Sequence, residues 1–200
     1  DDESDEEPFP DIKLEHSRQG VEAAKSQANT LFSKGSMEEC VRWFTKAIWL
    51  AGSGKAAGVP SDLHSILHSN RAFAYVKLGK WPEAEEDGSK AIAFNSKNTK
   101  AKYRRALARF ELGRAEDALV DLEDVLRELP DPNSNKEAVE LKKKVLQHLD
   151  AKKASGGAAA RIVDVTDDEP AGEAKALEAK QTTARTAGAP AAHGAAVAED

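Results

Sequence analysis

The residues best suited to chemistry lie in one short basic stretch, residues 97–109, which reads KNTKAKYRRALAR. Six of its thirteen side chains are Lys or Arg, although the formal net charge of the whole chain is -6. On a helix with about 100° per residue, Lys97, Lys100 and Arg104 share one face. Cationic N–H groups gathered on one face donate hydrogen bonds to anions such as carboxylates. The stretch therefore predicts a site for an acidic partner.

A second basic face of the same predicted helix offers an alternative ligand, nucleic acid. Lys102, Arg105 and Arg109 fall on this face, apart from the first group. Sites for single-stranded nucleic acid interleave aromatic side chains with the cations, and no such platform is evident in this stretch. Residues 17–153 are only mildly basic, with 24 Lys and Arg against 19 Asp and Glu. We therefore expect no nucleic-acid partner.

Histidine and cysteine give little support for catalysis or metal binding. His64 and His68 stand four residues apart, a spacing that could bind a metal ion from one helix face. No Glu follows the first His, as it does in zinc proteases, and no cysteine cluster accompanies the pair. Cys40 is the only cysteine, which excludes an intramolecular disulfide, and we expect a buried thiol. The sequence thus indicates no enzyme, no metal and no cofactor.

The composition divides the chain into a globular middle and two acidic ends. Residues 1–16 carry eight Asp and Glu and little apolar surface, and residues 153–200 are rich in Ala and Gly without apolar periodicity. Such segments bury too little apolar surface to offset the entropy of ordering, so we expect both to be disordered tails. Residues 17–152 are long enough to form one globular domain.

The same sequence favours a cytoplasmic protein, with the nucleus as a second location. No run reaches the roughly 20 apolar residues that a membrane span needs, and no basic-then-apolar signal opens the chain. A single cysteine gives no support for an oxidising compartment. The first residue is Asp1 rather than Met, which is compatible with a fragment of a longer protein.

An internal repeat organises the middle of the chain. Residues 69–92 align with residues 103–126 at a constant offset of 34, which superposes Gly79 on Gly113 and small residues on small residues. Residues 24–48 form an earlier copy once ten extra residues are allowed near the sequence AGSGKAAGVPSD. Each copy reads as two helices, so the sequence predicts three helix pairs.

Helix-boundary signals support this division. Ser36 and Glu39 make a capping-box pattern before the second helix of the first copy, and Pro82 suits the first turn of the equivalent helix in the second copy. A further helix is expected at about residues 136–151, where it would cap the open apolar face of the last copy.

With its 34-residue helix pairs, residues 17–152 resemble the tetratricopeptide-repeat family. The resemblance implies an all-α fold of three tandem repeats plus a C-terminal capping helix, forming a right-handed superhelical groove with disordered tails outside it. Pro130 stands where a repeat of this family usually ends. Gly88 and Arg109 depart from the family because both stand where an aromatic residue is common.

The resemblance extends to the co-chaperone members of the family, which bind chaperone tails through a carboxylate clamp. The clamp pattern is Lys and Asn four apart in the first repeat, Asn in the second, and Lys and Arg four apart in the third. This sequence matches with Lys25, Asn29, Asn70, Lys100 and Arg104. The resemblance implies that these residues bind the Glu-Glu-Val-Asp terminus of heat-shock chaperones of the seventy- or ninety-kilodalton class.

Two aromatic residues complete the predicted peptide site. Phe32 and Phe73 lie on the same leading helices as the clamp residues and are candidates for an apolar pocket under the peptide. An equally open alternative is that both rings belong to the ordinary core between repeats.

A different partner is suggested near the C-terminus. Ile162, Val163 and Val165 precede the acids 167–169 and resemble a SUMO-interacting motif, in which a short apolar strand adds to a sheet edge. The sequence therefore predicts a non-enzymatic adaptor for chaperone tails and an unidentified client. The alternative is a scaffold for another acidic partner, linked to SUMO through this segment.

Overall fold

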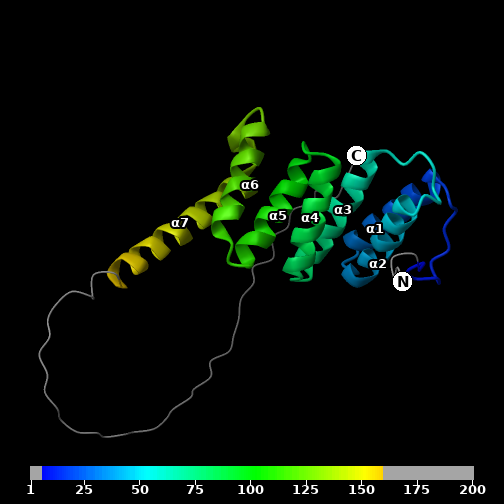
Figure 1. Cartoon of the computed structure of the whole chain (residues 1–200), viewed down its shortest axis with the longest axis horizontal. Helices are drawn as coiled ribbons and strands as arrows, with labels where there is room; N and C mark the ends of the chain where they lie inside the picture. The colour runs from blue at the N-terminus through cyan, green and yellow to red at the C-terminus, as the bar shows by residue number, and fades with distance from the viewer. Residues whose placement is uncertain (1–5, 160–200) are drawn as a thin grey trace, which may run out of the picture.

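The computed structural model describes residues 6–159, and it is helical and without strands over that range (Figure 1). This confirms the predicted all-α class. Its helices are α1 (Arg18–Ser33), α2 (Met37–Gly52), α3 (Ser61–Lys77), α4 (Trp81–Phe94), α5 (Thr99–Glu111), α6 (Ala115–Glu128), the short 3₁₀ helix η1 (Pro132–Ser134) and α7 (Lys136–Ala159).

The first six helices form three successive hairpins that lie side by side, with α7 against the last of them (Figure 1). The two helices of each hairpin pack on one another, and α2 packs on α3 as α4 packs on α5. Helices α3 and α5, the leading helices of the second and third hairpins, also touch. The expected three helix pairs and capping helix are therefore present.

Glycines at equivalent positions make the turn inside each hairpin. Gly35, Gly79 and Gly113 have φ values of 78°, 68° and 77°, in the left-handed region that a residue with a Cβ atom rarely adopts. Each follows the first helix of its pair, where a left-handed residue ends a helix by satisfying its last carbonyl groups. The glycine period read from the sequence is thus the period of the turns.

The apolar core consists of two clusters with a more polar region between them. One cluster joins α1, α2 and α3 around Phe44, Leu50 and Leu67, and the other joins α5, α6 and α7 around Leu122 and Val145. At the α4–α5 contact, small residues and the Arg109–Glu85 ion pair replace large apolar residues. This middle region contains the residues that depart from the family pattern.

Gly88 explains one departure, because it lets α4 approach α5 closely. A Cβ atom at this position would lie 2.8 Å from the Cβ atom of Arg105 and 3.4 Å from the carbonyl oxygen of Ala101. The α4–α5 interface therefore requires a residue without a side chain at position 88, because the two helix backbones pack closely there.

The two boundary predictions fared differently. Pro82 lies in the first turn of α4, as predicted. Ser36 is the N-cap of α2, as the boundary signal predicted, but the capping box itself was wrong, because the Ser36 side chain makes no capping hydrogen bond. Glu39 instead accepts hydrogen bonds from Arg42 at 2.8 and 3.1 Å, which takes its carboxylate away from the helix end.

The ends of the domain also differ from the expected boundaries. Residues 6–16 were expected within a disordered acidic tail, but the structure packs them on the first hairpin, with Ile12 buried and Leu14 against the core. Apolar residues between the acids, rather than average composition, account for this contact. Helix α7 continues to Ala159, beyond the expected end near residue 151.

Candidate functional site

Arg104 is the most buried of the predicted ligand-binding residues and the centre of the candidate site. Its side chain, on α5, reaches α3, where one terminal nitrogen, Nη1, donates to the carbonyl oxygen of Ser69 at 2.7 Å and to the Ser69 hydroxyl at 2.8 Å. Its guanidinium also lies over the ring of Phe73, 4.6 Å from the centroid. These contacts hold the cation in place, with only 8% of the residue exposed.

Arg104 nevertheless lacks a negative partner. No ion pair to Arg104 forms anywhere in residues 6–159. Burial without a carboxylate lowers the pKa of Arg104 to about 10, from its ordinary value of 12.5. The group still carries its charge at neutral pH, and a buried cation without a counter-ion is costly. The site is therefore electrostatically incomplete and suited to an anion.

Asn70 gives an independent sign of incompleteness beside Arg104. Its side-chain oxygen accepts from Arg104 Nη1 at 3.1 Å, and because a guanidinium only donates, this contact fixes the orientation of the amide. The amide nitrogen, Nδ2, is then buried without a hydrogen-bond partner among the described residues. An unsatisfied buried donor costs about 1–3 kcal/mol, so an acceptor on a ligand would relieve that cost.

Phe32 and Phe73 connect the leading helices of the three hairpins. Their rings stack with centroids 4.9 Å apart and an interplanar angle of 28°, which joins α1 to α3. Phe73 also lies beneath Arg104 and within 5.0 Å of the Lys77 ammonium. Both rings are half-buried, so they combine packing between repeats with an accessible apolar edge.

The remaining clamp residues lie on the two flanking helices. Lys25 and Asn29 are half-buried on α1, two turns and one turn before Phe32 on the same helical face. Lys100 is exposed on α5, one turn before Arg104. The structure thus joins these residues in a chain of contacts, in which Arg104 contacts Asn70 and Phe73, and Phe73 stacks on Phe32. It places Lys25, Asn29 and Lys100 on the flanking helices without a contact that joins them to this group.

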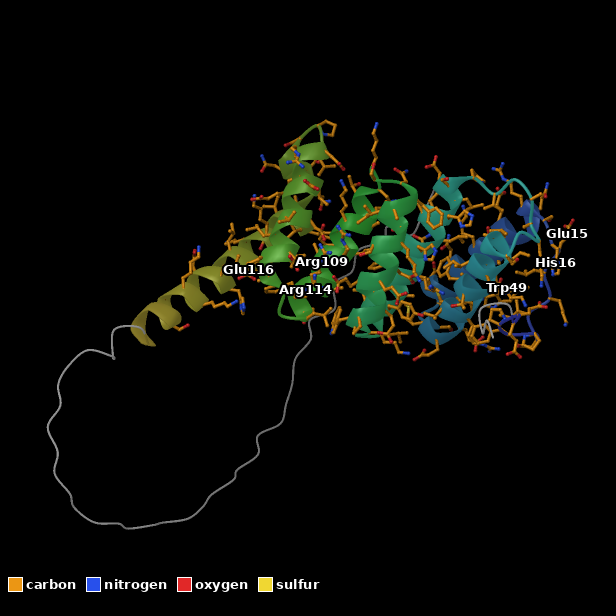
Figure 2. All side chains as sticks on the ribbon, in the orientation of Figure 1. Glu15, His16, Trp49, Arg109, Arg114 and Glu116 are labelled. Carbon is orange, nitrogen blue, oxygen red and sulfur yellow. The ribbon has the colours of Figure 1, made fainter. Side chains whose placement is uncertain are left out.

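The second basic face of α5 has a structural role. Arg105 makes a two-pronged ion pair with Asp121 at 2.9 and 2.6 Å, and Arg109 contacts Asp121 and Glu85, both at 2.9 Å. Figure 2 labels Arg109 and Arg114 beside this α5–α6 hairpin, and Arg114 donates to the same Glu85 at 2.6 Å. These cations are therefore paired with acidic side chains of the same domain.

Lys102, the third cation of that face, is also neutralised. Its ammonium lies 2.6 Å from Glu128, and only 7% of the residue is exposed. Of the six cations of the basic stretch, three thus form structural ion pairs, Arg104 is buried without one among the described residues, and Lys97 and Lys100 are exposed. Arg109 stands where an aromatic residue is common because it bridges α4 and α6 at this interface.

Ser69 is a contact residue that sequence reasoning missed. Its carbonyl and hydroxyl both receive Arg104 Nη1, so it positions the cation that the clamp pattern identifies. In the repeat register with an offset of 44 from the first copy, Ser69 is equivalent to Lys25. That equivalence was the available signal, because Lys25 is a predicted clamp residue of the first repeat.

The histidines and the cysteine serve packing. His68 is buried, and its Nδ1 lies 2.8 Å from Asp87, whereas His64 stacks on Phe94 with ring centroids 4.6 Å apart. Within the described residues, no group of three potential ligands could hold a metal ion. Cys40 is buried as expected, and burial raises the pKa of its thiol to about 12.

The predicted SUMO-binding residues and the expected lack of a membrane span can be compared with the structure only within residues 6–159. Ile162, Val163 and Val165, the proposed SUMO-binding residues, lie outside the described residues. None of the helices described here has the length and apolar character needed to span a bilayer.

Comparison with solved structures defines the class of protein. The first tetratricopeptide-repeat domain of Spaghetti (RPAP3), solved with the HSP90 peptide SRMEEVD, superposes with a TM-score of 0.57 and 33% identity, covering 69% of this chain and 98% of that one. The second such domain of human RPAP3, solved with the HSP70 peptide SGPTIEEVD, gives a TM-score of 0.53 and 32% identity, covering 62% and 93%. The chain belongs to the tetratricopeptide-repeat family.

Sequence comparison agrees with this assignment. Human RNA polymerase II-associated protein 3 is 37% identical over 158 residues, which cover 78% of this chain and 21% of that protein. The chain therefore spans about a fifth of the length of the curated relatives that it matches. No protein-family model matches the sequence.

Proposed function

We propose that this chain is a co-chaperone adaptor that binds the Glu-Glu-Val-Asp terminus of heat-shock chaperones through Lys25, Asn29, Asn70, Lys100 and Arg104. The observation that carries the proposal is that two neighbouring buried groups, on Arg104 and Asn70, both lack an interaction partner among the described residues. Within residues 6–159, Arg104 is a buried cation without a carboxylate partner, and Asn70 Nδ2 is a buried donor without an acceptor. A single carboxylate could pair with the Arg104 cation and accept a hydrogen bond from Asn70 Nδ2.

A terminal Asp suits this site because it presents two carboxylates, its side chain and its main-chain terminus, and both only accept hydrogen bonds. Asn70 and Arg104 provide a central pair of donors that are already held in place. Lys25 and Asn29 would approach from α1, and Lys100 from α5, so that the ligand is gripped from both flanks.

The number of donors fits the affinity that such a peptide requires. Hydrogen bonds to charged groups contribute about 1.5–3 kcal/mol each, and less where water competes. Micromolar binding needs about 8.2 kcal/mol, part of which must also offset the ordering of a flexible peptide. Several charge-assisted contacts are therefore needed, and two amide donors supply some of them without burying further charge.

The similar domains solved with HSP90 and HSP70 peptides support both chaperone classes as partners. We place the protein in the cytoplasm with these chaperones and assign it no catalytic step of its own. Its role would be to connect a chaperone tail to a client that other surfaces of the protein recognise.

Calorimetry of the full chain with a peptide that ends in Glu-Glu-Val-Asp tests the proposal. Amidating the peptide's C-terminus should weaken binding at least about tenfold, because one of the two carboxylates is lost. Lys100→Ala should weaken binding of the free-acid peptide by a similar factor, whereas Lys143→Ala removes an exposed lysine of α7 and should change affinity less than about twofold. Indifference to amidation would show that the site attracts acidic peptides without clamping a terminus.

A further inference from the structure

A second built site for an acidic segment lies on α2, away from the clamp residues. Its centre is Lys46, which is 1% exposed although its side chain ends in an ammonium group. The ammonium donates to the Glu7 carboxylate, to the carbonyl oxygen of Pro8 at 3.0 Å and to that of Phe9 at 3.3 Å. Its three N–H donors therefore have three acceptors, all from one stretch of chain.

Neighbouring residues of α2 contact the same stretch. Arg42 donates to Asp11 at 2.7 Å, and its guanidinium lies over the ring of Phe9, 4.9 Å from the centroid. The ring of Trp49 lies 5.2 Å from the Lys46 ammonium. Figure 2 shows Trp49 at this end of the molecule, close to His16. Two cations and an aromatic ring thus form a recognition surface, here called the Lys46 site, of Arg42, Lys46 and Trp49.

Residues 7–12, here called the strap, have a shape that matches this surface. Phe9 has a φ of 50°, and a turn closes where the Ile12 backbone N–H donates to the Phe9 carbonyl at 3.0 Å. Pro8 and Pro10 have no N–H groups, so the strap presents acceptors toward the lysine without leaving donors unsatisfied there. A left-handed non-glycine residue is strained, and the contacts with α2 must offset that strain.

From these contacts we infer that the Lys46 site is a second peptide-binding site, selective for an acidic segment with a proline-flanked aromatic residue, and that residues 7–12 fill it in cis. The inference does not rest on the clamp, because none of its residues belongs to the clamp. Loss of the strap would leave the Lys46 ammonium without its three acceptors, so a partner with the same chemistry would replace the strap.

The site can be tested in the full chain by releasing the strap and offering it again as a peptide. The release variant carries Glu7→Lys and Phe9→Ser, which act outside the helical core. The probe is an acetylated and amidated peptide of residues 6–13, and the measurement is the NMR shift of the Trp49 indole N–H. The release variant should show a saturable shift, whereas the wild-type chain, whose site is filled, should bind at least about tenfold more weakly.

Two matched controls identify the contacts. Replacing Glu7 by Gln in the peptide should weaken binding about fivefold or more, because a charge-assisted hydrogen bond becomes a neutral one. Lys46→Met in the release variant should remove the saturable shift while retaining a buried side chain of similar length. Clamp binding of a Glu-Glu-Val-Asp peptide should stay within about twofold in every variant, since the two sites share no residue.

Three results would overturn the inference. They are the absence of a saturable shift in the release variant, an equal shift in the Lys46→Met background, and equal peptide affinity in wild-type and release chains. A wild-type dimer in sedimentation that Glu7→Lys dissociates would assign the strap to a second copy and would overturn its assignment in cis.

Discussion

The two basic faces of α5 use the same residue types for opposite purposes. On one face, Arg105 and Arg109 share Asp121, and Lys102 pairs with Glu128, so every charge is neutralised within the domain. On the other face, Arg104 is more buried than Arg105 and Arg109, but among the described residues it has only neutral acceptors from Ser69 and Asn70. The difference between the two faces therefore lies in the partners, because one face has acidic partners and Arg104 has none among the described residues.

The Arg105–Asp121 ion pair has an equivalent in the preceding hairpin. Arg71 grips Asp87 with contacts of 2.6 and 2.8 Å, and both residues stand 34 positions before Arg105 and Asp121. A two-pronged pair therefore recurs in two consecutive hairpins, where it joins the leading helix to the following one. No such repetition exists for Arg104, whose equivalent in the second copy is Asn70.

The largest effect, on stability, is expected when the ion-paired face of α5 loses its shared acidic partner, Asp121. Asp121→Ala should lower the free energy of unfolding by about 3–5 kcal/mol, because it leaves the half-buried Arg105 without an acidic partner and Arg109 with Glu85 alone. Urea denaturation followed by circular dichroism measures this loss. Asp117→Ala, which breaks an exposed pair with Arg114, is the matched control and should shift the midpoint far less. Equal shifts would mean that the Asp121 network is no more than a surface ion pair.

An intermediate effect, on peptide affinity, is expected when an acidic side chain is introduced beside Arg104. Asn70→Asp should place a carboxylate beside Arg104 Nη1 and remove the unsatisfied Nδ2 donor, so the protein would complete its own site. Affinity for a Glu-Glu-Val-Asp peptide should fall about hundredfold, or about 2.7 kcal/mol, without a loss of thermal stability. Calorimetry and a melting curve measure the two properties.

Asn133→Asp supplies the control for that experiment, because it adds the same charge at an exposed residue of η1. It should change affinity less than about twofold. If both Asp variants weaken binding equally, net charge governs the interaction, and the contrast between the two faces of α5 has no bearing on ligand binding.

The sequence predicted the fold more completely than it predicted these contacts. Gly79 and Gly113 carry the period visibly, because a left-handed turn requires the same residue in each copy. Arg105 and Asp121 are 16 residues apart on different helices, so their pairing depends on how α5 and α6 cross. The clamp pattern identified Asn70 and Arg104, but the free Nδ2 donor depends on which amide atom Arg104 contacts.

The strap shows a different limit. Averaged composition emphasises the acids of residues 1–16 and gives little weight to Phe9, Ile12 and Leu14, which make the contacts with the first hairpin. The buried Lys46 that binds the strap lies on another helix and had no signal in the local pattern. Local averaging therefore fails where a few apolar residues and one distant cation order a polar segment.

The smallest effect is expected when the pH is lowered, and it concerns the stability that the Arg71–Asp87 pair provides rather than peptide binding. Burial alone would raise the pKa of Asp87, but hydrogen bonds from Arg71 and His68 outweigh burial and hold that pKa below its ordinary value of 3.8. A carboxyl group whose pKa is depressed by folding stabilises the protein above its unfolded pKa, and this contribution is lost as pH falls through the folded value. The free energy of unfolding should therefore fall as the pH drops below the unfolded pKa of Asp87. Asp87→Asn should be less stable at pH 7 and should show a shallower decline in acid, measured by urea denaturation at each pH. An unchanged slope would mean that Asp87 is bound no more strongly to Arg71 in the folded state than in the unfolded chain.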